Sequence, residues 1–224
     1  MRPASSLFTL YSADVIRITE CVECGSYVDK YIEYDIVLVL IDLVLQYQQA
    51  YRHILFNSNS KAFIRLIFIF VLCDAYKAWI ERTVHLNDGH NLFDLEWRFY
   101  LSLLRSAIEF ASFAFAVFCF RTVFGHFEKL AGNSQKDVLA FFESTLVGFY
   151  GSLFVVISII WQLYGHLSYR ILTQLFIFLS HLQVQRTLFT NVGFVMNFFA
   201  VFVGFTALFS AGVAFHNISH SFLL

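Results

Sequence analysis

Charged residues and proline are scarce in this chain, and both shortages limit what it can be. Only 14% of the residues are Asp, Glu, Lys or Arg, and a single proline occurs among 224 residues. Soluble domains carry about 25% charged residues. Hydrophobic residues reach 58% and include 29 phenylalanines, which is more apolar surface than a soluble domain of this size can bury. The composition therefore excludes an ordinary soluble domain and indicates a membrane protein.

Several common signatures of function are also missing. The net charge of -1 provides no basic field, so we expect no nucleic-acid partner. The 4 cysteines are too few for a disulfide scaffold. The N-terminus lacks the apolar core and cleavage site of a signal peptide, so we expect membrane entry through an internal segment. Nucleophile-elbow, P-loop, dinucleotide and HExxH motifs do not occur, and we expect no enzymatic activity.

Four long apolar segments are candidate transmembrane helices. A bilayer core of about 30 Å requires about 20 helical residues. The candidate spans are residues 61–80, 99–120, 138–164 and 192–215. The last is the strongest, because no Asp, Glu, Lys or Arg occurs after Arg186. Each should be a helix, since lipid demands internal backbone hydrogen bonds and no barrel-like alternation is visible.

A fifth segment, residues 171–185, leaves two interpretations open. It is free of charge but short, and three glutamines and His181 interrupt it. It is either a half-inserted or interfacial helix, or a fifth span. Lysine and arginine gather in residues 1–61 and 121–137. With four spans, the positive-inside rule then predicts a cytosolic N-terminal region.

A polar, turn-forming cluster at residues 57–60 separates a small head from the apolar body. We therefore expect two domains, residues 1–57 and residues 58–224. The predicted fold class is an all-α multi-span membrane protein with four, or five, transmembrane helices. A small N-terminal α+β head precedes the helices.

Within the head, an extended segment is expected over residues 27–34, where aromatic and β-branched residues alternate with polar ones. Asp35 is the expected N-cap of a helix that continues to about Phe56. This helix either lies in the membrane interface, with tyrosines at headgroup depth, or packs as an ordinary helix of the head.

Cys21 and Cys24 have the Cys-x-x-Cys spacing that lets two thiolates bind one cation. A structural zinc site needs four ligands, usually two such pairs. Residues 1–20 contain no Cys or His, and Cys73 and Cys119 lie in candidate spans. The pair is thus half a zinc site, which a second subunit would complete, or a metal-free remnant. A redox role lacks the βαβ context it requires.

Arg105 and Glu109 lie four residues apart in the second candidate span and share one helix face. Ionisable groups at membrane depth face the bundle interior or pair with each other. This intramembrane pair either contacts a lipid headgroup or sterol hydroxyl, or is structural. A third hypothesis assigns it to a lipid-modifying enzyme. Small residues in the last span permit close packing in a bundle or homo-oligomer.

Two blocks in the head resemble the Arv family of multi-span endoplasmic-reticulum membrane proteins: residues 28–35 (VDKYIEYD) and residues 50–57 (AYRHILFN). The resemblance covers about residues 10–57. The family pattern has two Cys-x-x-Cys pairs that form a zinc ribbon. Cys21 and Cys24 match the second pair, and the first has no counterpart in this sequence.

The resemblance implies sterol and lipid homeostasis in the endoplasmic-reticulum membrane. The implied roles are intracellular sterol transport, sphingolipid balance and supply of glycosylphosphatidylinositol intermediates. Membrane lipids, sterol above all, would be the partners, and zinc the cofactor of the incomplete site. The alternative is an adaptor subunit that stabilises a membrane lipid-modifying or transferase complex. Residues expected to anchor at headgroup level or to dock the head are Tyr31, Tyr34, Tyr51, Arg52 and His53.

Overall fold

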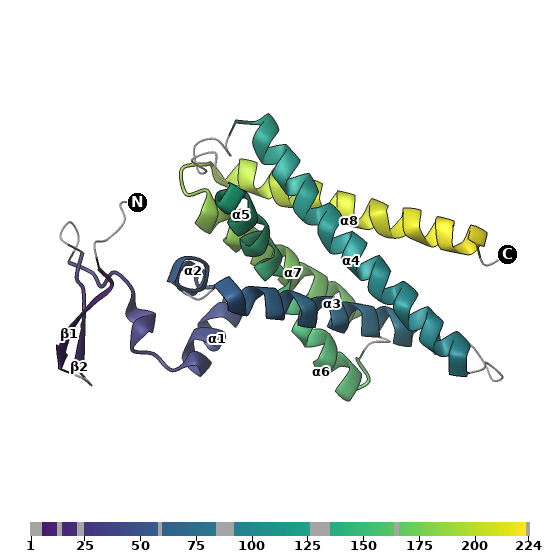
Figure 1. Ribbon diagram of the computed structural model, residues 1–224, viewed down its shortest axis with the longest axis horizontal. Coiled ribbons are helices and arrows are strands. Elements are labelled where there is room, and N and C mark those ends of the chain that lie inside the picture. The colour runs from purple at the N-terminus through teal and green to yellow at the C-terminus, as the bar shows by residue number, and fades with distance from the viewer. Residues whose placement is uncertain are drawn as a thin grey trace. The chain divides into compact units, whose positions relative to one another are not determined.

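The computed structural model describes residues 6–12, 15–21, 25–57, 60–83, 92–125, 135–163 and 166–222. The chain divides into two compact units, the head unit (Met1–Ser58) and the bundle unit (Asn59–Leu224). The described part of the chain is mostly helical, with one two-stranded sheet in the head unit (Figure 1). The predicted combination of a small α+β head and a helical body is confirmed at this level.

The sheet of the head unit consists of β1 (Phe8–Ser12) and β2 (Val15–Ile18), which run antiparallel. β-Branched residues dominate β2 and favour an extended backbone. After the sheet, the Gly25 amide donates a hydrogen bond of 2.8 Å to the Cys21 carbonyl. Gly25 has a φ of +67°, a left-handed conformation that glycine adopts without strain. This hydrogen bond therefore fixes the Cys21 carbonyl relative to Gly25.

The segment after this turn differs from the extended structure expected over residues 27–34. Only Tyr27 pairs in a β-bridge, with Glu20, and a 3₁₀ turn, η1 (Lys30–Ile32), follows. The expectation of a strand was wrong because the Asp29 side chain accepts the Tyr31 amide. Such local side-chain bonds compete with strand pairing.

Asp35 does occupy the N-cap position of a helix, α1 (Ile36–Val44), although its side chain makes no capping bond. The expected continuous helix to Phe56 is wrong, because the chain breaks at Gln46, whose φ is +63°. The remaining helical segments of the head unit are α2 (Gln48–Arg52) and the π-helical turn η2 (His53–Asn57).

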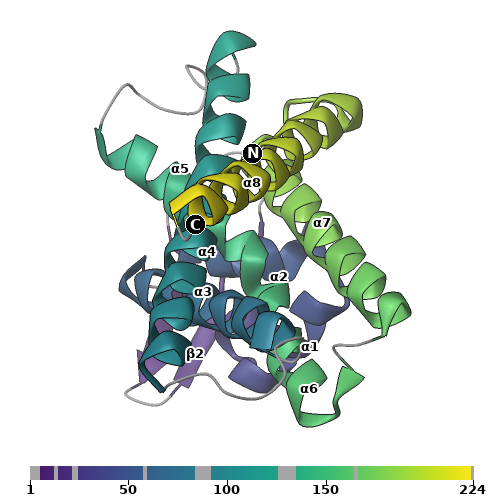
Figure 2. The same cartoon turned by 90° about the vertical axis from the view of Figure 1, so that its right-hand side faces the viewer.

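The bundle unit contains the longer helices. They are α3 (Ser60–Thr83), α4 (Leu92–Val123), α5 (Gln135–Val147), the 3₁₀ segment η3 (Gly148–Leu153), α6 (Phe154–Ile160), α7 (Leu167–Leu188) and α8 (Phe194–Phe222). Figure 2 shows α4, α7 and α8 from the end of the bundle at which α8 finishes.

Two helices of the described residues are long and apolar enough to cross a membrane, over Glu96–Val123 and Phe194–Ser219. They contain or overlap the predicted spans 99–120 and 192–215. The helix α3 covers the predicted span 61–80 but does not reach the same apolar standard.

The predicted span 138–164 is not one regular helix, since η3 separates α5 from α6. Two glycines of η3 bring its backbone against α7. A Cβ on Gly148 would overlap the His181 ring, and one on Gly151 would lie 2.7 Å from Ile177. This close approach gives a physical reason for the change in helix type.

The helices α4 and α8 pack against each other along the bundle (Figure 1). Gly204 permits the contact, because a Cβ there would lie 2.6 Å from the Phe113 ring. Phe113 also contacts Phe149 and Phe205 edge-on, with ring centroids 5.1 Å and 5.3 Å apart. Phenylalanine rings from three elements thus form the centre of the bundle.

Candidate functional site

Asp29 is the centre of a polar cluster inside the head unit. Its Oδ1 accepts the Tyr31 amide at 2.9 Å, and its Oδ2 lies 2.7 Å from Nδ1 of His53. The Asn57 side-chain amide also donates to Oδ2. The Asp29 side chain is only 5% exposed. Burial alone would raise the pKa of Asp29, but the bonds from His53, Asn57 and the Tyr31 amide hold it below its ordinary value.

A second carboxylate, Asp42 of α1, receives groups from η1. The Tyr31 hydroxyl donates to Asp42 at 2.7 Å, and the Lys30 ammonium lies 3.7 Å from the same oxygen. That ammonium also lies 4.8 Å from the centre of the Tyr31 ring and 5.8 Å from that of Tyr34. Burial and the bond to Asp42 raise the pKa of Tyr31 well above its usual range, so this tyrosine is neutral at physiological pH.

The structure brings three of the five predicted anchoring residues together. Tyr31 contacts Tyr34 and His53, with ring centroids 5.6 Å apart in both pairs. Tyr51 lies elsewhere in the unit, and its hydroxyl donates to the Gln46 side chain at 2.8 Å. Tyr31 and Tyr51 are buried, Arg52 and His53 are half-buried, and Tyr34 is 44% exposed. Their role in anchoring or docking stays a prediction.

The acceptors that hold this cluster were not predicted from the sequence. Asp29, Asp42 and Asn57 were not among the expected site residues, yet they receive the bonds of Tyr31 and His53. Asp29 and Asn57 belong to the two blocks that carry the family resemblance. The presence of a carboxylate in one block and a histidine in the other was the available signal.

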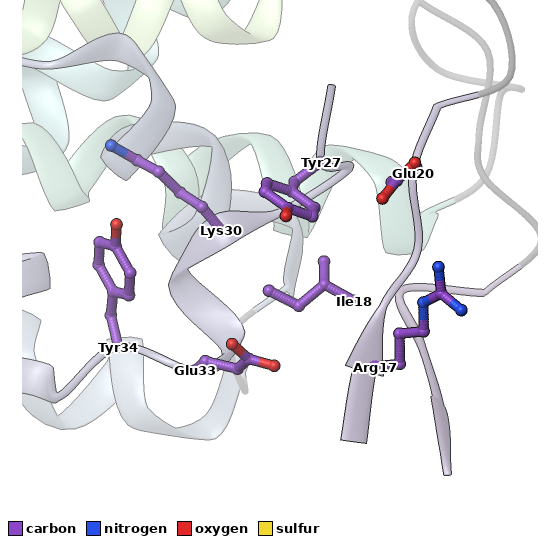
Figure 3. Close-up of a pocket in the computed structure, with 7 residues that line it drawn as sticks. All are labelled: Arg17, Ile18, Glu20, Tyr27, Lys30, Glu33 and Tyr34. Carbon is purple, nitrogen blue, oxygen red and sulfur yellow. The ribbon is translucent and has the colours of Figure 1, made fainter. Parts of the chain in front are cut away.

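A pocket of about 380 Å³ opens beside this cluster in the head unit (Figure 3). The strand β2 and Glu20 form one side, and Tyr27 and the η1 region form the other. Side chains of both charge signs line the pocket together with the apolar Ile18, which suits a polar or zwitterionic group. The lining residues are Arg17, Ile18, Glu20, Tyr27, Lys30, Glu33 and Tyr34.

The predicted half zinc site is only partly visible. Cys21 is a half-buried free thiol, whereas Cys24 lies outside the described residues. Among the residues that the structure describes, no group of three or more His, Cys, Asp or Glu side chains is placed to hold a metal ion. Zinc binding by this pair therefore stays a prediction.

The predicted intramembrane pair lies in α4 of the bundle unit. Nε of Arg105 is 2.6 Å from Oε1 of Glu109, and Glu109 is 9% exposed. The Glu109 carboxylate packs against Gly212 of α8, where a Cβ would overlap it. The neighbouring Ser106 hydroxyl donates to Asp74 of α3 at 2.8 Å. The pair thus has a structural position between helices, and lipid contact stays a prediction.

These features define a class of protein. The chain is a membrane protein with apolar helices, and its N-terminal unit carries a small sheet and a buried polar-aromatic cluster. That cluster is built from the same two blocks, residues 28–35 and 50–57, that resemble the Arv family.

The chain belongs to the Arv1-like family, whose model matches residues 1–185. The resemblance noted over about residues 10–57 is confirmed and extends well into the bundle unit. Protein ARV1 of Mus musculus is 34% identical over 196 residues, which cover 85% of this chain and 72% of that protein. Protein ARV1 of Homo sapiens is 30% identical over 210 residues, covering 90% and 74% respectively.

A third relative matches a shorter part of the chain at higher sequence identity. Protein ARV1 of Saccharomyces cerevisiae is 53% identical over 58 residues, which cover 26% of this chain and 18% of that protein. No solved structure matches this chain.

Proposed function

We propose that this chain is a non-enzymatic lipid-homeostasis protein of the endoplasmic-reticulum membrane that mediates or supports sterol transport out of that membrane. Sphingolipid balance and supply of glycosylphosphatidylinositol intermediates would be linked roles, as the family resemblance implies. The observation that carries the proposal is the distribution of apolar side chains, which face outward on helices of both units.

The helix α7 buries several polar residues and exposes one apolar face, although Ile177, Leu182, Val184 and Leu188 of the same helix are also buried. Ser180, His181 and Gln185 are completely buried. The outward face carries Ile171, Leu172, Leu175 and Leu179, which are 48–64% exposed. A helix of a soluble protein shows the opposite arrangement. Lipid around the bundle accounts for this inversion, because it solvates the leucines and leaves the polar groups to pair internally.

The helix α1 of the head unit exposes apolar side chains around most of its circumference. Only Val39 and Leu43 are buried among its apolar residues. A patch of this kind is typical of a surface that contacts protein or membrane. We infer that α1 lies in the membrane interface, where a lipid would enter or leave. The exposed apolar residues of α1 are Ile36, Val37, Leu38, Leu40, Ile41 and Val44.

We propose four membrane crossings from the spans 61–80, 99–120, 138–164 and 192–215, with α7 as a fifth. The 22 residues of α7 correspond to about 33 Å of helix, which matches a hydrocarbon core of about 30 Å. With four crossings the positive-inside rule predicts a cytosolic head, and with five the C-terminus moves to the lumenal side.

Zinc would bind Cys21 and Cys24 only if two further ligands come from a second copy of the chain. The fixed turn at Cys21 suits a ligand, because the backbone bond from Gly25 holds its position. Metal analysis of the purified protein tests this proposal. One zinc per two chains supports the shared site, and the absence of zinc contradicts it.

Sterol photocrosslinking to the purified full-length protein is the direct test of the main proposal. We expect a photoreactive sterol to label peptides of the bundle unit, and excess unlabelled sterol to prevent the labelling. Competition by an equally hydrophobic alkane would show that the labelling is not specific for sterol and would contradict the proposal.

An adaptor role is the second candidate, and the surface of β1 favours it. Leu10 and Tyr11 are 68% and 73% exposed at one end of the two-stranded sheet. An exposed strand of this kind can pair with a partner protein. A membrane enzyme that purifies with the chain in fixed stoichiometry, and that is lost when Leu10 and Tyr11 become serine, would support the adaptor role. Sterol crosslinking without such a partner would support lipid handling.

A further inference from the structure

Arg121 is a positive charge completely buried in the bundle unit. Its Nη2 donates to Oδ1 of Asn197 at 2.6 Å and to Oε1 of Gln185 at 3.1 Å. Its Nε lies 3.3 Å from the same Gln185 oxygen. The guanidinium stacks over the Phe189 ring, 4.1 Å from its centroid. The end of α7 and the start of α8 therefore position this one side chain.

These contacts orient Arg121 but do not neutralise it. Its hydrogen-bond acceptors are amide oxygens, and Nη1 has no hydrogen-bonding partner in the described structure. Arg105, in the same helix, is instead paired with Glu109 at 2.6 Å. Buried charges in proteins are ordinarily paired with an opposite charge. Arg121 thus offers an unmatched charge together with an unused donor.

The position of Arg121 indicates what would match it. Arg121 lies two residues before the end of α4, at Val123, and Asn197 lies three residues after the start of α8, at Phe194. One apolar span ends at Val123 and the other begins at Phe194, so Arg121 lies near one end of the hydrocarbon-spanning region. Figure 1 shows the end of α4 and the start of α8 at the same end of the bundle. The phosphates of membrane phospholipids lie just beyond that depth. The planar donor set of arginine fits phosphate oxygens well.

We propose that Arg121, held by Gln185 and Asn197, binds the phosphate of an anionic membrane phospholipid through its unused Nη1 donor. The site requires a membrane location of the bundle but not sterol binding, so it goes beyond the proposed function. The recognised chemistry is a phosphate anion, for which free phosphate is the other source.

The test compares lipid binding by purified full-length variants in detergent, measured by native mass spectrometry. The probes are dioleoyl phosphatidate, dioleoylglycerol, which lacks the phosphate, and inorganic phosphate. The variants are Arg121→Met and the control Arg186→Met. Arg186 follows Gln185 directly near the end of α7 and is half-buried. Its guanidinium carbon lies 5.6 Å from the centroid of the Phe194 ring.

We expect phosphatidate to bind Arg121→Met about tenfold more weakly than the wild type or Arg186→Met, as for the loss of one charged hydrogen bond. Dioleoylglycerol should not distinguish the variants. Equal phosphatidate affinity in Arg121→Met and Arg186→Met would overturn the proposal. If inorganic phosphate binding depends on Arg121 and phosphatidate binding does not, the site binds free phosphate, and the proposal of a phospholipid ligand is wrong.

A second measurement uses the wild type alone and so does not depend on the folding of a variant. A phosphatidate with a photoreactive group next to its phosphate should label peptides within residues 183–198. Labelling confined to other peptides would contradict the site. Sterol crosslinking to Arg121→Met separates the two proposals, because we expect the sterol label to persist when phosphatidate binding is lost.

Discussion

The Asp29 cluster of the head unit and the Arg121 site of the bundle unit differ in how their buried polar groups are paired. In the head unit, Asp29 receives three donors, and the Tyr31 hydroxyl has a carboxylate acceptor. In the bundle unit, Arg121 has neutral partners only, and neither ring nitrogen of His181 has a hydrogen-bonding partner in the described structure. Complete pairing indicates that the head cluster holds a fold together. Incomplete pairing leaves Arg121 and His181 of the bundle buried without a full set of polar partners.

The largest expected effect comes from Asp29→Ala. It leaves His53, Asn57 and the Tyr31 amide without their acceptor, and we expect a loss of about 3 kcal/mol in the stability of the head unit. Hydrogen–deuterium exchange of α2 peptides in the full-length protein measures this loss. Asp35→Ala is the control, because its exposed side chain makes no capping bond, and it should cost about 0.5 kcal/mol. Equal losses in the two variants would show that the Asp29 cluster does not stabilise the head.

A smaller effect is expected in the bundle from Gly204→Val. The added side chain overlaps Phe113 between α4 and α8, and overpacking of this kind costs about 2 kcal/mol. We expect Gly204→Val to have a lower melting temperature than the wild type, measured on the purified protein in detergent. Gly193→Ala is the matched control, since nothing lies within 4 Å of a Cβ there. Unchanged melting of Gly204→Val would contradict the close packing of these two helices.

Tyr31→Phe should have a still smaller effect. It removes the hydroxyl bond to Asp42 and keeps the ring contacts, so we expect a loss of about 1 kcal/mol. Tyr34→Phe should change the stability little, because Tyr34 is 44% exposed. Exchange protection of η1 and α1 peptides gives both values. A larger loss of stability in Tyr34→Phe than in Tyr31→Phe would contradict a stabilising role for the Tyr31–Asp42 hydrogen bond.

Strong acid should lower the stability of the head unit, whereas small pH changes near neutrality should leave that stability unchanged. The folded-state pKa of Asp29 lies below its ordinary value of 3.8. Its contribution to stability is therefore complete above that value and declines as the pH falls through the lowered pKa. Exchange protection of α2, corrected for intrinsic exchange rates, should fall below about pH 4 in the wild type. Asp29→Asn should lose this dependence, and an unchanged acid response in that variant would contradict the assignment.

The sequence predicted some features of each unit and missed others for physical reasons. Long apolar runs identified α4 and α8, because length and composition are local properties. The break at Gly148 depends on its contact with His181, which is 33 positions away in the sequence and gives no local signal. The Asp29 cluster was missed for the same reason, since His53 and Asn57 lie 24 and 28 residues away from Asp29.

The helix α7 is longer than the charge-free segment that the sequence indicated. Its glutamines and His181 were treated as interruptions of an apolar segment, which made residues 171–185 look too short for a span. Gln185 and His181 are in fact completely buried, and the helix extends from Leu167 to Leu188. Polar residues on the inner face of a membrane helix lower its mean hydropathy without excluding it from the bilayer.

Spin-label accessibility in liposomes tests most directly whether lipid surrounds the outward apolar faces. Single labels would replace Leu175 on α7, Val37 on α1 and Glu33 in the head unit, in a background in which the 4 native cysteines are serine. We predict that the labels at positions 175 and 37 are relaxed by oxygen and shielded from a water-soluble nickel chelate, whereas the label at position 33 is accessible to the chelate. Free access of the nickel chelate to position 175 would contradict the account.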